Sequence, residues 1–258
     1  MSSGRLKGKH AVISGGAAGV GGAAAEIFSS EGASVAIIDI QEEVGTALAD
    51  EICQKGGQAF FAKADVSSSE EVANAIGVVK EKFDNRIDIL FNHAGTVIIK
   101  PFLETTEQEW DWMMDVNVKS MFLMTRAVLP SMLQQGGGAI VNTSSISAVA
   151  GTPMEVLYCT SKGACHMFTR AIATEYRDQG IRCNAVCPGF IRTAQGLREL
   201  KELRGLGIDV TEEDLCRLQG RICEPEEVAK AALFLASSDA SFVNGETMFV
   251  DNGMLVST

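Results

Sequence analysis

The sequence of 258 residues predicts one α/β domain: a doubly wound sheet of seven parallel strands with helices on both faces. Short apolar, β-branched runs alternate with helical patterns along the chain, and strands joined by helical crossovers form parallel sheets. No linker, low-complexity tract or internal repeat interrupts this alternation. The hydrophobic share of 46% and charged share of 21% are typical of a folded protein with one sizeable core.

Seven runs predict strands that are buried on both faces, because they are apolar without a polar alternation. They cover residues 10–14, 34–39, 59–66, 87–95, 138–145, 181–189 and 247–253. Helix starts between them are indicated by Ser68 with Glu71, by Thr106 with Glu109, and by Pro225 followed by two glutamates.

Residues 190–223 depart from the alternation, since they contain no strand pattern and are densely charged. They follow the carboxyl end of a predicted strand, where open α/β sheets bind ligands. We therefore expect a substrate lid here. Its basic residues either bind a substrate carboxylate or sulfonate, or form a solvated helix face: Arg192, Arg198, Lys201 and Arg204.

Composition excludes several classes of function. A net charge of −11 opposes binding to nucleic acid or to an anionic membrane, and no run approaches the roughly 18 apolar residues of a membrane span. Seven cysteines without a C-x-x-C pair, and only three histidines, predict neither a disulfide framework nor a metal site. The first apolar run has four residues, too short for a signal peptide. These features predict a cytoplasmic protein.

A glycine turn follows the first predicted strand. Gly15, Gly19 and Gly21 precede or open a helix whose free N–H groups and dipole favour a diphosphate, although a tight turn without ligand explains them too. Asp39 closes the second strand, where a carboxylate would hold ribose hydroxyls; the alternative is a helix-capping role. A ribose 2′-phosphate would be repelled there, and Ile40 offers no cation. The predicted cofactor is NAD.

Tyr158 and Lys162 stand four residues apart on a predicted helix. An inward face is predicted from five residues at helical spacing, Val156, Cys159, Gly163, Met167 and Ala171, with the tyrosine and lysine on a neighbouring face. A phenol of ordinary pKa about 10 becomes a usable base if a nearby ammonium lowers that pKa. Ser144 and Ser145 end a strand at the ligand edge, where a hydroxyl can bond the same substrate oxygen. A surface tyrosine with a solvated lysine is the alternative.

Over essentially its whole length the sequence resembles the short-chain dehydrogenases/reductases in their single-domain form. The T-G-x-x-x-G-x-G turn of that family corresponds to residues 14–21, with Ser14 replacing threonine, and N-N-A-G corresponds to residues 92–95, with His93 replacing an asparagine. Asn117, Ser145 thirteen residues before Tyr158, the Y-x-x-x-K pair, the turn Pro188-Gly189 and the pair Asp65-Val66 also match.

This resemblance implies a Rossmann-like fold and a role for each matched residue. Tyr158 would be the general base, Lys162 would also bind the nicotinamide ribose, Ser145 would orient the substrate oxygen, and Asn117 would hold a proton-relaying water. Cofactor contacts are implied for these residues: Ser14, Gly15, Gly19, Val20, Gly21, Asp39, Ile40, Asp65, Val66, Asn92, Ala94, Gly95, Tyr158, Lys162, Pro188, Gly189, Ile191 and Thr193. His93 is expected to be a tolerated variant packed near the cofactor, and His10 and His166 to be ordinary.

These observations predict an NAD-dependent oxidoreductase that converts a secondary alcohol to a ketone. The alternatives are a 3-oxoacyl-type ketoreductase, disfavoured by Asp39 and by the acidic chain, and a non-catalytic nucleotide-binding protein. An apolar pocket wall, and hence an apolar or cyclic substrate, is expected unless its residues are lid core: Val97, Ile98, Val149, Met154, Val156, Leu157, Leu197 and Leu206.

The expected partners, besides the substrate, are further copies of the chain. Predicted helices 107–134 and 155–178 carry more apolar residues than one sheet face needs, among them Trp112, Met121, Phe122, Met124, Met167 and Phe168. The family resemblance implies that these helices pair between subunits and give a homotetramer.

Overall fold

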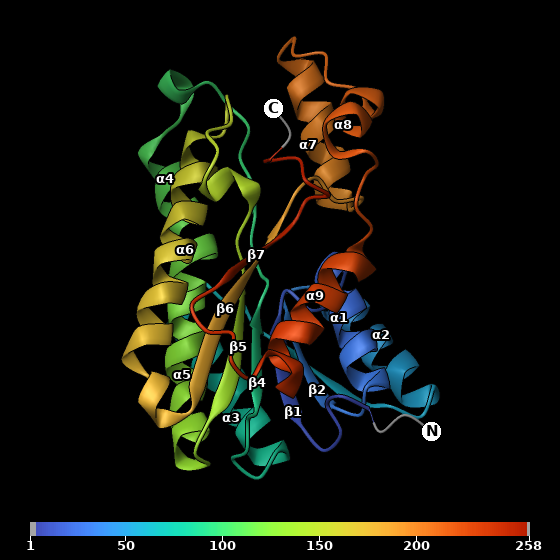
Figure 1. Ribbon diagram of the computed structural model, residues 1–258, viewed down its shortest axis with the longest axis vertical. Helices are drawn as coiled ribbons and strands as arrows, with labels where there is room; N and C mark the ends of the chain where they lie inside the picture. The colour runs from blue at the N-terminus through green and yellow to red at the C-terminus, as the bar shows by residue number, and fades with distance from the viewer. Residues whose placement is uncertain (1–3, 257–258) are drawn as a thin grey trace.

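The computed structural model describes residues 4–256, in which seven parallel strands form one sheet in the order β3-β2-β1-β4-β5-β6-β7 (Figure 1). The strands are β1 (His10–Ser14), β2 (Ser34–Asp39), β3 (Gln58–Lys63), β4 (Ile89–Asn92), β5 (Gly138–Thr143), β6 (Ile181–Pro188) and β7 (Thr247–Val250). The longer helices are α1 (Gly19–Ser30), α2 (Glu42–Gln54), α3 (Ser69–Lys82), α4 (Glu107–Met114), α5 (Ser120–Gln134), α6 (Val156–Glu175), α7 (Ala194–Gly205), α8 (Glu212–Gln219) and α9 (Pro225–Ala236). The predicted fold class is confirmed.

Helices cover both faces of the sheet, with α1, α2 and α9 on one side and α3, α5 and α6 on the other (Figure 1). Neighbouring residues of β1 point into opposite layers: Ala11 and Ile13 pack with α1 and α9, and Val12 packs with α3 and α5. All three side chains are fully buried. The strands are therefore apolar at successive positions, as the sequence indicated. Within the described residues, no helix combines the length and apolar character needed to span a bilayer.

The predicted helix starts are confirmed. The Ser68 hydroxyl accepts a hydrogen bond from the Glu71 backbone N–H at 3.3 Å. Thr106 and Glu109 form a reciprocal capping box at α4, and Pro225 is the first residue of α9.

The predicted inward face of α6 is wrong. Val156 and Met167 are 42% and 60% exposed, and the buried face consists instead of Leu157, Ser161, Lys162, Cys165, His166, Thr169 and Ala173. Polar side chains can occupy this face because they have partners: Thr169 donates to the Cys165 carbonyl, and His166 contacts Thr247 of β7.

The strand order reverses beside β1, because β2 and β3 extend from one of its edges and β4 to β7 from the other. β1 and β4 pair in register from Ala11↔Ile89 to Ser14↔Asn92. After these two neighbouring strands the chain therefore continues toward opposite sides. Such a point leaves a crevice at the carboxyl ends of the strands, where ligands bind. Helices α7 and α8 lie at this end of the molecule (Figure 1).

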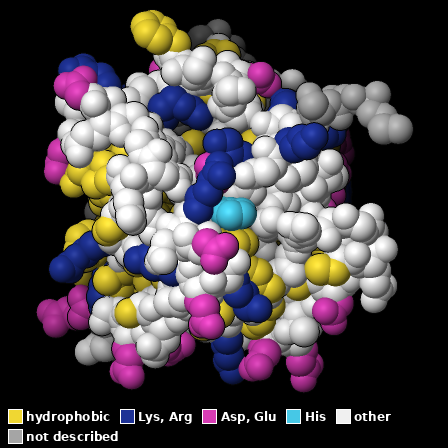
Figure 2. Space-filling view, turned by 90° about the horizontal axis from the view of Figure 1, so that it is seen from below, with side chains coloured by type: hydrophobic (Ala, Val, Ile, Leu, Met, Phe, Trp, Pro, Cys, Tyr) yellow, Lys and Arg dark blue, Asp and Glu magenta, His cyan; other side chains and the backbone are white. Residues whose placement is uncertain are grey.

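The opposite end, seen in Figure 2, carries Lys and Arg side chains across its middle with acidic side chains among and around them. Here Lys9 and Arg86 both pair with Asp88, at 3.0 and 3.1 Å. Burial opposes ionisation of Asp88, but hydrogen bonds from Arg86, from the His10 backbone and from Lys9 outweigh it and hold its pKa below the usual value. These contacts hold together the segments that directly precede β1 and β4.

Candidate active site

A cleft of about 580 Å³ lies at the carboxyl ends of the strands, within the size range of small-molecule sites. Most of the site residues expected from the sequence line it: Gly15, Gly19, Val20, Asp39, Ile40, Asp65, Val66, Ala94, Gly95, Ser145, Tyr158, Lys162, Pro188, Gly189, Ile191 and Thr193. They come from the loops after β1 to β6 and from α6. The topology thus gathers residues that are far apart in the sequence.

The glycine turn after β1 has the shape required to hold a diphosphate. Gly15 and Gly19 have φ of +66° and +55°, and a Cβ on Gly15 would lie 2.7 Å from the Ala94 backbone. A Cβ on Gly21 would lie 1.9 Å from the Gly15 carbonyl oxygen. No side chain caps the start of α1 at Ala18. The first backbone N–H groups of α1, at the cleft end of the helix, therefore have no side-chain acceptor. These features fit the diphosphate of a dinucleotide.

Asp39 ends β2 at the edge of the cleft and is 8% exposed. One carboxylate oxygen accepts from the Ala17 N–H at 3.1 Å and the other from the Gln41 N–H at 3.0 Å. The carboxylate is thereby held against the glycine turn. Ile40, the next residue, is 62% exposed and brings no charge.

Ser145, Tyr158 and Lys162 meet at the other end of the cleft. The Ser145 hydroxyl acts on the Tyr158 phenol, whose pKa it lowers, and accepts from the Ser147 N–H at 3.1 Å. The Lys162 Nζ lies 5.6 Å from the centroid of the Tyr158 ring and donates to the Thr143 carbonyl at 2.9 Å. The Thr143 contact anchors the ammonium beneath the phenol.

The expected lowering of the Tyr158 pKa by Lys162 is wrong for this structure. Burial raises the Tyr158 pKa above its usual value, and the hydrogen bond from Ser145 opposes this rise without cancelling it. Burial also lowers the pKa of Lys162. Desolvation is the largest influence on both pKa values.

Four expected site residues lie behind the cleft instead of lining it: Ser14, Gly21, Asn92 and Asn117. The Ser14 hydroxyl accepts from the His93 N–H at 3.2 Å, and the Asn92 side chain donates to Asn142 at 2.8 Å. Both contacts support the loop after β4. The side-chain amide oxygen of Asn92 is buried and has no hydrogen-bond partner among the described residues.

Asn117 lies in a π-helical turn between α4 and α5, residues Asp115–Lys119, and is 4% exposed. Its amide oxygen accepts from the Thr96 N–H at 2.7 Å, and its amide nitrogen donates to the Thr96 carbonyl and the Ser161 hydroxyl, both at 2.9 Å. Such turns often occur at functional sites. Asn117 ties the cleft-lining Thr96 to α6, and its role in holding a water stays a prediction.

The cleft also contains His93, Ser144 and Arg198, which the sequence had indicated, Ala194 and Gln195 of the expected lid, and Thr96 beside the expected wall residue Val97. Sequence reasoning missed the remaining lining residues: Ala18, Gln41, Ala64, Trp112, Val116 and Thr143. Burial, and then the charge of Lys162, lower the pKa of His93 to about 3, so its imidazole is neutral. Its Nδ1 lies 3.0 Å from the Thr143 hydroxyl. This agrees with a variant packed in the cleft rather than one that exchanges protons.

The expected apolar wall is wrong, because none of its eight residues lines the cleft. Val97 and Leu157 are buried in the core, and Val149, Val156 and Leu197 are at least 42% exposed. Trp112 and Val116 provide apolar surface instead. The sequence signal for them was only their place near Asn117, five residues before it for Trp112 and directly before it for Val116.

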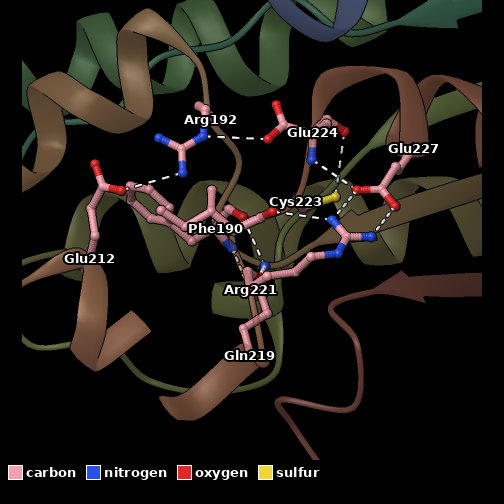
Figure 3. Close-up of polar contacts among 9 residues, drawn as sticks. Phe190, Arg192, Glu212, Gln219, Arg221, Cys223, Glu224 and Glu227 are labelled. Atoms are coloured by element: carbon pink, nitrogen blue, oxygen red, sulfur yellow. Dashed lines mark hydrogen bonds and ion pairs between the residues drawn. The ribbon is translucent and has the colours of Figure 1, made fainter. Parts of the chain in front are cut away.

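The segment predicted as a lid forms α7 and α8, and its two ends are joined beneath them (Figure 3). Gln219 accepts from the Phe190 N–H at 2.8 Å and donates to its carbonyl at 3.0 Å. Arg192 pairs with Glu212 at 3.3 Å and with Glu224 at 3.4 Å. Leu200, Leu215 and Ile222 form a small core of their own. The segment is therefore a separate unit fixed at its base.

Two acidic residues stand near Tyr158 without having been singled out in the sequence. Glu155 is 3% exposed, and burial raises its pKa from 4.5 to about 7. Burial, followed by the charge of Glu155, raises the pKa of Glu199 to about 8. Both carboxyls thus hold protons more tightly than usual.

Glu155→Gln is expected to raise the free energy of unfolding, relative to wild type, more at pH 8 than at pH 5. The folded protein keeps Glu155 protonated to about pH 7, whereas the unfolded chain ionises near 4.5, so the native protein loses stability as pH rises through this window. The difference in unfolding free energy between variant and wild type should grow by about 3 kcal/mol. Urea unfolding at both pH values measures it. Glu104→Gln, at an exposed side chain, controls for the loss of an acidic charge, and an equal response of both variants would contradict the prediction.

Over nearly its whole length the chain is similar to known dehydrogenases and reductases. A family model described as enoyl-(acyl carrier protein) reductase matches residues 15–255. A dehydrogenase/reductase SDR family member 6 of Aquarana catesbeiana is 40% identical over 252 residues, and a cyclopentanol dehydrogenase of Comamonas sp. (strain NCIMB 9872) is 38% identical over 252 residues. In both cases 97% of this chain and 98% of the relative are covered.

A solved structure of a gluconate 5-dehydrogenase from Burkholderia cenocepacia J2315, in complex with NADP and tartrate, has the same fold. It superposes with a TM-score of 0.89 at 32% identity, covering 99% of this chain and 98% of that one. Two of these proteins are named as dehydrogenases of hydroxyl compounds, cyclopentanol and gluconate, and the solved one holds NADP.

Proposed function

The chain belongs to the short-chain dehydrogenase/reductase family, and we propose that it is an NAD-dependent dehydrogenase that oxidises a secondary alcohol to a ketone. The observation that carries this proposal is the meeting of Ser145, Tyr158 and Lys162 at one end of a cleft whose other end holds Asp39. A proton acceptor and a dinucleotide site in one cleft are what such an oxidation requires.

Each side chain of the site has its own part in the proposed reaction. A nicotinamide cofactor held in the cleft would supply the acceptor for the hydride on the carbon that bears the hydroxyl. The Tyr158 phenolate takes the hydroxyl proton, and the Ser145 hydroxyl donates a hydrogen bond to the same substrate oxygen. Lys162, anchored on the Thr143 carbonyl, favours the phenolate by its charge and so opposes, without cancelling, the effect of burial.

Preference for NAD over NADP rests on charge at the adenosine end of the cleft. The Asp39 carboxylate is fixed there by two backbone N–H groups and would repel a ribose 2′-phosphate. Among the described residues that line the cleft, the basic ones are Lys162 and Arg198, and both belong to the substrate end. At the adenosine end, the described lining residues therefore include no guanidinium or ammonium that could bind that phosphate.

The proposed substrate has an apolar or cyclic skeleton of modest size. Trp112 and Val116 supply the apolar surface for it, and a relative named cyclopentanol dehydrogenase is consistent with a carbocyclic alcohol. A 3-oxoacyl-type ketoreductase is the second candidate, and the family model described as an enoyl-(acyl carrier protein) reductase favours it. An acidic chain is a poor docking surface for an acidic carrier protein.

A panel of cyclic, steroid, sugar and linear secondary alcohols tests the proposal, with NAD and NADP supplied separately and NADH formation followed by its absorbance. We expect at least one alcohol to be oxidised with NAD and to be oxidised much more slowly with NADP. Reduction of 3-oxoacyl thioesters in preference to any alcohol oxidation would support the second candidate. NADH binding without turnover of any alcohol or ketone would contradict both.

We also propose a homotetramer in a reducing, cytoplasmic compartment. Trp110, Phe122 and Met167 on α4, α5 and α6 are 41%, 45% and 60% exposed, which supports pairing of these helices between copies. Met121 and Met124 are not part of that surface, contrary to expectation, because they are buried in their own subunit. The seven cysteines are unpaired, which suits a reducing compartment.

A further inference from the structure

Helix α7 presents two polar side chains to the substrate end of the cleft, Gln195 and, one turn later, Arg198. They lie in the same cleft wall as Trp112 and Thr96. Resting on the dehydrogenase function proposed above, we propose that the substrate is a hydroxy acid whose carboxylate is bound by Arg198 with help from the Gln195 amide.

The contacts of Arg198 leave its guanidinium available to a ligand. Its Nε lies 3.5 Å from a Glu202 oxygen, and its Nη2 donates to the Val97 carbonyl at 3.4 Å. Both distances are at the long end of the range for such contacts. Among the described residues, none accepts a hydrogen bond from its Nη1, and the side chain is 49% exposed. A guanidinium so placed can offer a carboxylate two parallel N–H donors.

The other basic residues of the lid are used elsewhere. Arg192 is bound between Glu212 and Glu224 at the base of the lid (Figure 3), and Arg204 donates to the Val210 carbonyl. Lys201 is exposed and does not line the cleft. Of the four basic residues expected from the sequence, Arg198 is thus the one that reaches the cleft.

Glu202 is the acidic group paired with Arg198, and it contacts only the Nε. Glu155 and Glu199 are the carboxyls whose charges act on Tyr158, and burial raises their pKa values to about 7 and about 8, so both are largely protonated below pH 7. Asp39 and Asp65 lie at the adenosine end of the cleft. A single, half-exposed cation suits a carboxylate, whereas a doubly charged phosphate generally draws on several cations or a helix start.

Matched pairs of a hydroxy acid and its methyl ester test this inference, for example 3-hydroxycyclohexanecarboxylate with its ester. The ester keeps the secondary alcohol and the ring and lacks only the charge. In the wild type, kcat/KM with NAD should favour the acid. In Arg198→Gln the ratio of acid to ester should fall about 10- to 100-fold, the usual effect of losing a hydrogen bond to a charged group.

Lys201→Gln removes the same charge from the same helix and should leave the ratio unchanged. Because the readout is a ratio, a general effect of Arg198→Gln on the lid cancels between acid and ester. Wild-type preference for the ester in every pair, or an unchanged ratio in Arg198→Gln, would overturn the inference while the dehydrogenase function stands. Absence of any alcohol oxidation would instead overturn the proposed function and this inference with it.

Discussion

Tyr158→Phe is expected to lower kcat for alcohol oxidation about a thousandfold and to change NADH affinity only a few-fold. Among the described residues of the cleft wall, the Tyr158 phenol is the group that Ser145 acts on and that lies beside the Lys162 ammonium. Loss of a positioned base typically costs two to four powers of ten in rate. Steady-state kinetics and NADH fluorescence titration measure the two quantities.

Tyr176→Phe is the matched control, because Tyr176 is the other tyrosine of the chain and follows the far end of the same helix. Removal of that hydroxyl should leave kcat within about twofold. Burial raises the Tyr158 pKa, so wild-type oxidation should speed up as pH rises and more phenolate forms, and this slope should vanish in Tyr158→Phe. Residual activity of Tyr158→Phe within tenfold of wild type would exclude the tyrosine as the base.

The seven strands could be predicted because parallel strands buried on both faces leave a direct trace in the sequence. Val12, Ala11 and Ile13 are apolar in succession for that reason. The strand ends were less accurate: predicted strand 87–95 ends at Asn92 in the structure. Residues 93–95 leave the sheet to line the cleft, and an apolar run does not record where backbone pairing stops.

The buried face of α6 could not be predicted from apolar spacing. That spacing selected Val156 and Met167, which are exposed, and omitted Lys162, which is 5% exposed. Lys162 is buried because the Thr143 carbonyl, distant in sequence, accepts its hydrogen bond. Partners of this kind depend on the tertiary fold, so a polar residue with a buried partner looks like a surface residue in the sequence.

The prediction of the apolar substrate wall was wrong for a related reason. Leu197 and Leu206 of the lid were expected to face the cleft, but they are 45% and 40% exposed and do not line it. The leucine that packs into the lid's own core is Leu200. Gln195 and Arg198 face the cleft instead. Which side of a docked helix meets a cavity is set by how its ends are fixed, here by Phe190 with Gln219, and helical periodicity alone does not contain that information.

Replacing Asp39 and Ile40 together, by Asp39→Asn and Ile40→Arg, is expected to shift cofactor preference toward NADP at least a hundredfold. Asparagine keeps the size and one acceptor oxygen, which can serve either the Ala17 or the Gln41 N–H group, and it removes the charge that repels a 2′-phosphate. Arginine at the exposed position 40 can bind that phosphate with charge-assisted hydrogen bonds, each contributing about 1.5–3 kcal/mol. The ratio of kcat/KM with NADP to that with NAD measures the shift.

Asp65→Asn tests whether the effect is local. Asp65 also lines the cleft and also carries a carboxylate, which accepts from the Ser67 N–H at 2.9 Å, but it follows β3 instead of β2. If any loss of negative charge near the adenosine site promoted NADP use, Asp65→Asn would shift the ratio as strongly as Asp39→Asn. The geometry predicts a shift from Asp39→Asn alone, since the Asp39 carboxylate is the one held against the glycine turn. Wild-type enzyme that used NADP as efficiently as NAD would show that this carboxylate does not select the cofactor.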